Sequence, residues 1–204
     1  MAYRTLTISR EYGSGGASIA RIVAERLGWE LLDRGLIEAI ARAGHVDEKV
    51  VHRLDERAES WLARINRDAM RAASIGAGII PEQGTYFDPD VMTELTRMVI
   101  EEAYTHGNCV IVGRGAQCIL QNKPDVFHAF VYAPLHDRIA RLRQRLETGV
   151  NVDQRIHAVD SARAHYLRQN FFKEWNDPHL YDMMICSHRG EKATANVILY
   201  ALTA

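Results

Sequence analysis

The chain has 204 residues, the length of one domain with room for a helical insertion rather than of two full domains. Hydrophobic residues make up 47% of it and charged residues 25%, which excludes disordered, collagen-like and coiled-coil proteins. The net charge is −1, from 25 Lys and Arg against 26 Asp and Glu, so the overall charge does not indicate a nucleic-acid partner.

The first predicted unit is a strand followed by a glycine-rich loop and a helix. A short β-rich run covers residues 3–8, three glycines lie within residues 13–16, and apolar residues recur at helical spacing over 18–27. A second short strand is predicted over 29–32. Asp33 then stands where it can cap a helix that runs to about residue 43.

The middle of the chain is predicted to be a helical insertion, at about residues 45–106. A charged helical pattern with one apolar stripe covers 47 to about 74, and a helix is predicted from Asp90 to about Thr105. The stripe is long for a segment that has one small domain to lie against. We therefore expect a homodimer formed partly through residues 47–74, unless the stripe packs on the following helix.

The last third of the chain returns to strands that alternate with helices. Near-continuous apolar runs at 109–113 and 126–132 are typical of strands buried on both faces of a parallel sheet. Further elements are predicted as a basic helix over 134–146, a helix over 153–172, a strand over 182–187 and a closing helix over 192–202. This alternation predicts an open α/β sheet. Ligands of such sheets lie outside the carboxyl ends of the strands, so we expect residues 9–16, 113–114 and Ala133 to line one crevice.

The glycine loop is the strongest candidate for a binding site. A glycine-rich turn before a helix N-terminus turns several backbone N–H groups towards one space, which suits a phosphate. The residues expected to bind phosphate are Gly13, Ser14, Gly15, Gly16, Ala17 and Ser18. The alternative is that the glycines only close a tight turn. Against the P-loop pattern G-x-x-x-x-G-K-[ST], Arg10 takes the first Gly position, Gly16 the Lys position and Ala17 the next.

Several segments together resemble a known family. They are the strand and loop at 6–16, the segments 110–114 and 126–134, the pair Asp160 and Arg163, and the later residues Tyr166, Trp175, Asp177, Tyr181 and Asp182. These motifs resemble the cytidylate kinase-like family, a divergent branch of the P-loop nucleoside monophosphate kinases.

The resemblance implies a fold, an activity and cofactors. The implied fold is a three-layer αβα P-loop kinase fold in a single domain, with a core at 1–44 and 107–204 and a lid at about 145–156. The implied activity is ATP-dependent phosphoryl transfer to CMP, dCMP or a related small acceptor, with ATP and Mg²⁺ as cofactors. Small nucleotides are then the expected partners.

The resemblance also implies roles for single residues. It places Arg114 on the acceptor monophosphate, and Asp33, Asp160 and Arg163 near the acceptor. Arg138 and Arg141 share one face of a predicted helix and are candidate lid arginines that close over the triphosphate. The alternative for both is a solvated basic face.

Two departures from true cytidylate kinases remove charge from the reacting centre. Gly16 replaces the Lys that cradles the β- and γ-phosphates, and Val112 stands where those kinases typically carry Asp. An active enzyme then needs another cation, and Arg10 is preferred because it leaves the same loop. If so, Gly16→Lys is expected to rescue Arg10→Ala in part, provided that the loop can still accept a Lys. The alternative is that Arg10 pairs with Glu11 or a surface carboxylate.

Metal, disulfide and membrane sites are not predicted. The nine histidines and three cysteines show no metal-ligand spacing, and the cysteines are interpreted as reduced core thiols. No apolar run approaches the roughly 18 residues of a membrane span, and the N-terminus opens directly into a strand pattern. We therefore expect a cytoplasmic protein without a membrane partner.

Two other functions stay open at this point. One is a nucleotide- or phosphate-binding protein without catalysis, in which the lost Lys reflects lost chemistry. The other is a kinase that acts on a small molecule other than a nucleotide.

Overall fold

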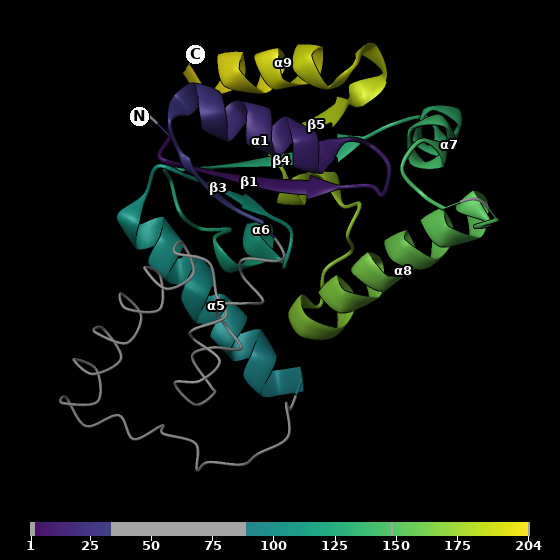
Figure 1. The fold of residues 1–204 in the computed structure, drawn as a ribbon. Coiled ribbons are helices and arrows are strands. Elements are labelled where there is room, and N and C mark those ends of the chain that lie inside the picture. Colours follow the sequence, from purple (N-terminus) through teal and green to yellow (C-terminus); the bar gives the residue numbers. More distant parts are fainter. Residues whose placement is uncertain (1–2, 34–88, 148, 204) are drawn as a thin grey trace, which may run out of the picture. The chain divides into compact units, whose positions relative to one another are not determined.

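The computed structural model describes residues 3–33, 89–147 and 149–203 (Figure 1). The chain divides into two compact units, one made of residues 1–33 and 106–204 and the other of residues 34–105. Of the second unit the described part is helix α5 (Pro89–His106), which agrees with the helix predicted over 90–105. The apolar stripe at 47–74, with the expected dimer surface, lies outside the described residues.

The first unit is built on a five-stranded parallel sheet. Its strands are β1 (Thr5–Arg10), β2 (Glu30–Leu32), β3 (Cys109–Val112), β4 (Val126–Tyr132) and β5 (Met183–Cys186), in the order β2-β3-β1-β4-β5. Every neighbouring pair is parallel. β1 and β3 are almost wholly buried because helices cover both faces, which explains their near-continuous apolar sequences. The predicted α/β class is confirmed.

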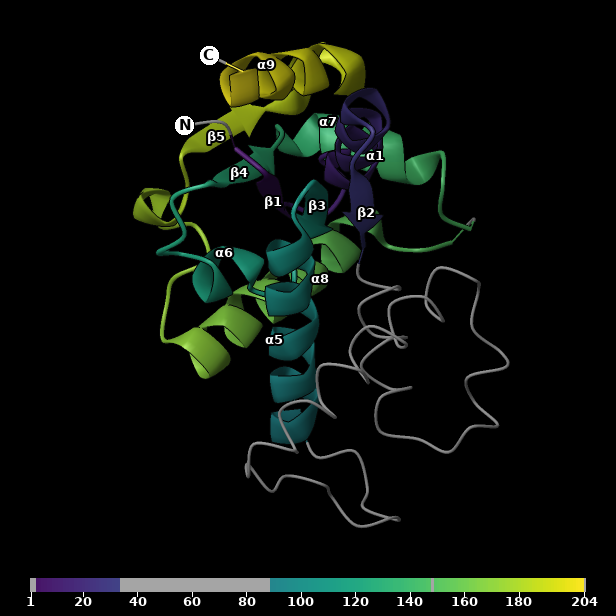
Figure 2. The ribbon, with the colours of Figure 1, turned by 90° about the vertical axis from the view of Figure 1, so that its left-hand side faces the viewer.

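The helices of this unit form two layers around the sheet. α1 (Gly16–Leu27) and α9 (Glu191–Thr203) cover one face, and α6 (Ala116–Ile119) and α8 (Val152–Phe171) lie on the other (Figures 1 and 2). α7 (Leu135–Arg143) connects β4 to α8, and the short 3₁₀ turns η1 (Pro178–Leu180) and η2 (Ser187–Arg189) flank β5.

The main core lies between the sheet and the α1/α9 layer. Its fully buried side chains come from alternate strand positions and from one stripe of each helix, and they include Leu6, Ile8, Ile19, Val23, Val110, Ala129 and Ile198. Their alternation leaves Thr5, Thr7 and Ser9 of β1 facing the α6/α8 layer. None of the helices in the described ranges is long and apolar enough to cross a membrane.

The strand register brings three chain segments to one edge of the sheet. Ile8 of β1 pairs with Val112 of β3, and Arg10 pairs with Val131 of β4. The loop after β1, the turn after β3 and the end of β4 therefore meet at the carboxyl edge, where a ligand of a parallel sheet binds. These are the segments that the sequence analysis expects to line one crevice.

Candidate functional site

The loop between β1 and α1 is shaped by two left-handed glycines. Gly13 has φ 84° and Gly15 has φ 82°, a region that other residues enter only with strain. Ser14 lies between them, fully buried, and its hydroxyl donates to the carbonyl of Glu11 at 2.9 Å. This backbone path is the kind that turns successive N–H groups towards one concave space.

The first turn of α1 continues that space. The first helical hydrogen bond runs from the N–H of Ile19 to the carbonyl of Gly15 at 3.0 Å, and Gly15 caps the helix without a side chain. Within the described part of the chain, no backbone carbonyl accepts from the N–H groups of residues 16–18. These groups and the helix dipole suit an anion, and binding of a phosphate at residues 13–18 stays a prediction.

Arg10 lies directly across this loop. A Cβ atom placed on Gly16 would lie 2.5 Å from the Cβ of Arg10 and 2.8 Å from its Cγ, so the stem of the arginine passes over Gly16. The Nη1 atom of Arg10 fills the place that a Cβ on Gly113 would take. The side chain therefore extends from the end of β1 to the turn after β3, above the N-terminus of α1.

Arg138 of α7 holds the loop from outside. Its side chain is 8% exposed, its Nε donates to the carbonyl of Tyr12 at 2.7 Å, and Nη1 lies 3.2 Å from a carboxylate oxygen of Glu11. Its Nη2 pairs with Asp160 of α8, and the other oxygen of Asp160 accepts from the N–H of Tyr12 at 2.8 Å. Arg138 thus links the loop to α8.

Arg141, one helical turn later, binds the next part of the loop. Its Nη1 donates to the carbonyl of Ser14 at 3.0 Å, and its Nη2 to the carbonyl of Ser187 at 2.7 Å. The Ser187 hydroxyl also donates to the Ser14 carbonyl, at 2.6 Å. Neither Arg138 nor Arg141 lies on a solvated basic face here. Their expected contact with a triphosphate stays a prediction.

Glu11 is a site residue that the sequence reasoning did not select. Besides pairing with Arg138, it accepts a hydrogen bond from the N–H of Ala133 at 3.0 Å. It therefore ties the glycine loop to the end of β4. In the sequence, Glu11 could have been selected because it directly follows a buried strand. Its contact with residue 133 could not have been predicted, because only the fold brings the two together.

Two of the predicted acceptor residues lie on α8. Arg163 donates to the carbonyl of Arg10 at 2.6 Å and its guanidinium lies 5.8 Å from the ring centre of Tyr12. Asp160 and Arg163 are one helical turn apart, and Nη1 of Arg163 lies 3.5 Å from Oδ1 of Asp160. Both bind the backbone at the start of the loop, and their contact with an acceptor stays a prediction.

Arg114 lies at the end of β3 in an unusual backbone conformation. Its φ is 56°, between Gly113 at 79° and Gly115 at 71°. A non-glycine residue in this region costs about 1–2 kcal/mol, and such strain gathers at functional sites. Its guanidinium lies 5.9 Å from the ring centre of Tyr166 on α8. Asp33, directly after β2, is exposed, and the helix it was expected to cap lies outside the described residues.

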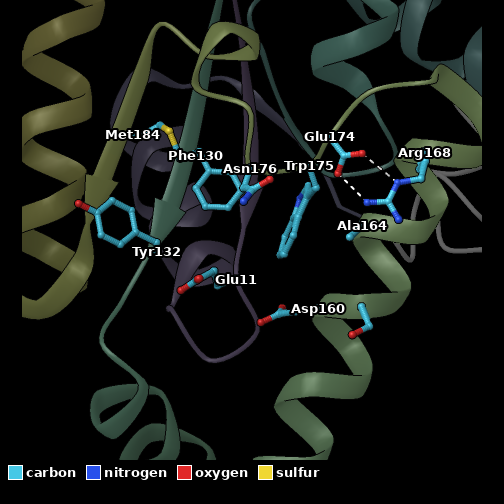
Figure 3. A pocket seen from close by; sticks show the side chains of 11 residues that line it. Glu11, Phe130, Tyr132, Asp160, Ala164, Arg168, Glu174, Trp175, Asn176 and Met184 are labelled. Carbon is cyan, nitrogen blue, oxygen red and sulfur yellow. Dashed lines mark hydrogen bonds and ion pairs between the residues drawn. The ribbon is translucent and has the colours of Figure 1, made fainter.

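A cavity of about 750 Å³ adjoins the loop on the α8 side of the sheet. The cavity is lined by Glu11 of the glycine-loop segment and by Asp160, one of the predicted site residues. Figure 3 shows the ring of Trp175 pointing into it beside Phe130, and the two rings pack edge to face with centroids 5.3 Å apart.

Trp175 is held in this position by Tyr181. The Tyr181 hydroxyl donates to the Trp175 carbonyl at 2.7 Å, and burial raises the pKa of Tyr181, so the hydroxyl keeps its proton. The exposed ion pair between Arg168 and Glu174 lies beside Trp175 and also lines the cavity (Figure 3). Trp175, one of the residues that carry the family resemblance, therefore lies at a cavity wall.

Mg²⁺, which the resemblance implies, does not find its usual protein ligands here. Ala17 stands at the P-loop position of the Ser or Thr ligand and has no side-chain oxygen. Val112 is buried at the end of β3, where an Asp was expected. The loop therefore fits a phosphate, but neither of these positions fits Mg²⁺, an ion that requires oxygen ligands.

Comparisons with known proteins support the fold. Three of the solved structures that cover nearly the whole chain illustrate this. An uncharacterized protein from Eubacterium ventriosum is 19% identical, with a TM-score of 0.69 and 98% of each chain covered. Shikimate kinase from Bacteroides thetaiotaomicron is 14% identical, with a TM-score of 0.51 and 98% of each chain covered. A gluconokinase from Sinorhizobium meliloti is 11% identical, with a TM-score of 0.53, covering 100% of this chain and 94% of that one.

Identities this low show a shared fold and nothing finer, and the predicted P-loop kinase fold is confirmed. No curated protein sequence matches the chain. The model of the cytidylate kinase-like family, in contrast, matches residues 5–189. Since this match spans both the glycine loop and the residues of α7 and α8 that hold it, the chain belongs to the cytidylate kinase-like family.

Proposed function

We propose that this chain is an ATP-dependent kinase that transfers a phosphoryl group to CMP, dCMP or a related small acceptor. The observation that carries the proposal is the glycine loop with Arg10 across Gly16 at the carboxyl edge of the sheet. The N–H groups at the start of α1 suit phosphate oxygens, and Arg10 adds a full positive charge beside them. Family membership supports a pyrimidine monophosphate as the acceptor.

In the proposed reaction an oxygen of the acceptor phosphate attacks the γ-phosphorus of ATP. The bond between that phosphorus and the β–γ bridging oxygen breaks, and ADP and the acceptor diphosphate leave. A phosphomonoester is largely a dianion at neutral pH, so the attacking oxygen needs no general base. Catalysis then depends on position and on charge neutralisation, to which Arg10 and the loop N–H groups contribute.

The other arginines have different proposed roles. Arg138 and Arg141 are positioning residues in the structure described here, because they bind the loop backbone and its carboxylate partners. Arg114 is proposed to bind the acceptor phosphate, and Asp33, Asp160 and Arg163 to contact the acceptor. The strained backbone of Arg114 supports its assignment.

The test is a transfer assay with ATP and a panel of acceptors. CMP, dCMP, UMP, AMP, shikimate and gluconate are each supplied with ATP, and ADP release and thermal shift are recorded. We expect turnover with CMP or dCMP, and a loss of about 10²–10³-fold in kcat for Arg10→Ala, the usual effect of removing one transition-state donor. The matched control is Arg21→Ala, on the exposed side of α1. Full activity of Arg10→Ala would exclude Arg10 as the compensating cation.

A second candidate is a nucleotide-binding protein without catalysis. It is favoured by the combination of Gly16, Ala17 and Val112, which removes three side chains that the chemistry of related kinases uses. ATP would then raise the melting temperature while no acceptor in the panel releases ADP. Turnover with shikimate or gluconate and none with nucleotides would instead support a kinase of another small molecule.

A further inference from the structure

Two histidines and an aspartate converge where α7 begins. His136 and Asp137 lie in the first turn of α7, and His188 comes from η2, 51 residues later along the chain than Asp137. The ligand atoms of the three side chains all lie within 4.8 Å of one another. Nδ1 of His188 is 2.6 Å from one oxygen of Asp137, and Nε2 of His136 is 3.3 Å from the other.

Helix geometry does not impose this convergence. Consecutive residues of a helix point about 100° apart and do not face each other. The His136 ring nevertheless turns towards the carboxylate of its neighbour, and the two imidazole rings pack at 70° with centroids 6.1 Å apart. A hydrogen bond between Asp137 and His188 alone would leave the orientation of His136 unexplained.

We propose that His136, Asp137 and His188 bind a divalent transition-metal ion of the Zn²⁺ type, which joins α7 to the turn after β5. Two imidazole nitrogens and one carboxylate oxygen are a ligand set of open zinc sites, in which water takes the fourth position. Such ligand atoms lie about 2.0–2.2 Å from the ion, hence about 3–4 Å from each other. The separations in this cluster are close to that range.

The exposure of the two histidine side chains allows them to rotate to the distances that a metal ion requires. Asp137 is 20% exposed and is held from both sides, whereas His136 is 75% exposed and His188 61%. The two imidazoles can therefore rotate to complete the site at little packing cost. Imidazole ligands favour Zn²⁺, Ni²⁺ and Cu²⁺ over Mg²⁺ and Ca²⁺, which prefer oxygen.

The place of the site gives it a structural consequence. His188 follows Ser187, whose hydroxyl binds the carbonyl of Ser14 in the glycine loop. Asp137 stands one turn before Arg141, which binds the same carbonyl. A metal ion would therefore link α7 to η2, the two segments whose side chains bind the loop backbone. This inference does not depend on phosphoryl transfer, because it concerns other residues and another ligand.

The experiment uses the full chain without a histidine tag, treated with EDTA and then freed of it. Binding of ZnCl₂ is measured by calorimetry and thermal shift, and CoCl₂ serves as a probe whose visible absorption reports nitrogen and oxygen ligation. We expect one Zn²⁺ per chain, a rise in melting temperature that saturates at one equivalent, and no comparable effect of MgCl₂. His188→Gln and His136→Gln should each weaken Zn²⁺ binding at least tenfold.

His179→Gln is the matched control, because His179 is exposed in the turn η1, before β5, and lies outside the cluster. Both cluster variants alter exposed side chains, so circular dichroism is expected to show an intact fold. Absence of saturable Zn²⁺ binding to the wild type would overturn the proposal. So would equal binding by the wild type and both cluster variants, because the ion would then lie elsewhere on the chain.

Discussion

The contact between Arg10 and Gly16 predicts that these two positions are coupled. A Cβ on Gly16 would lie 2.5 Å from the Cβ of Arg10, more than 1 Å inside an ordinary carbon–carbon contact of about 3.5–4.0 Å. The backbone of Arg10 is restrained, because it pairs with Val131 of β4 and its carbonyl accepts a hydrogen bond from Arg163. Gly16→Ala must therefore shift the backbone of the loop or of the strand end.

Overpacking of this kind costs about 1–3 kcal/mol. For a chain of this length each kcal/mol lowers the melting temperature by about 2–4 °C, so Gly16→Ala should lower it by about 2–12 °C. In the double variant Arg10→Gly/Gly16→Ala the clash is gone, because glycine has no Cβ. The double-mutant cycle should then give a coupling free energy of about 1–3 kcal/mol.

The assay is denaturant unfolding of the wild type, the two single variants and the double variant. Ala17→Ser, at the exposed next position of the same turn, controls for general sensitivity of the helix start. Equal stability of Gly16→Ala and the wild type, or additive effects in the cycle, would refute the packing argument. The same geometry bears on the condition set for rescue in the sequence analysis: alanine at residue 10 keeps the Cβ, so the loop has no room for a lysine at residue 16, and Gly16→Lys should not rescue Arg10→Ala. Rescue requires Arg10→Gly.

Three further predictions concern other parts of the unit. Arg138→Ala should lower the free energy of unfolding, measured by denaturant titration, by about 2–3 kcal/mol. This is less than the loss of a fully buried ion pair costs, because the partners of Arg138 are partly exposed. The control Arg143→Ala, on the solvent side of α7, should change the free energy little. Arg114→Gly should weaken acceptor binding in calorimetry and leave the melting temperature nearly unchanged, because relief of the left-handed φ offsets the flexibility of glycine; a large fall in melting temperature would contradict this. Burial lowers the pKa of His128, so as the pH falls the unfolded chain takes up a proton there before the folded chain does, and stability should decrease as the pH drops through about 6.5. Melting temperatures measured from about pH 7.5 to 5.5 should depend less on pH in His128→Gln than in the wild type. The same pH dependence in both proteins would refute the argument.

The sheet could be predicted from the sequence because its signals are local. The apolar run at 109–113 and the glycines before α1 each report on their own element, and the edge where strands end follows from parallel topology alone. Element ends were less accurate. The basic helix was predicted over 134–146 and α7 ends at Arg143, because the pattern of charges continues into the turn that follows the helix.

The contacts around the loop could not be predicted in the same way. Spacing placed Arg138 and Arg141 on one helix face but did not say which way that face points. Their partners Tyr12 and Ser14 are more than 120 residues away along the chain. The cluster of His136, Asp137 and His188 was missed for the same reason, because its third member comes from a separate turn.

The degenerate loop motif gains a different meaning once Arg10 and Gly16 are considered as a pair. In the P-loop pattern the first position is Gly and the later one Lys, and here the small and the cationic residue have exchanged places. When each position is compared separately with the pattern, residue 10 has lost its Gly and residue 16 has lost its Lys. In the structure the two positions face each other with room for one side chain, so a cation at residue 10 requires Gly at residue 16. The missing Lys therefore does not by itself indicate lost chemistry, because Arg10 carries a positive charge on the opposite side of the loop. The turnover of Arg10→Ala decides whether that charge acts on the phosphates.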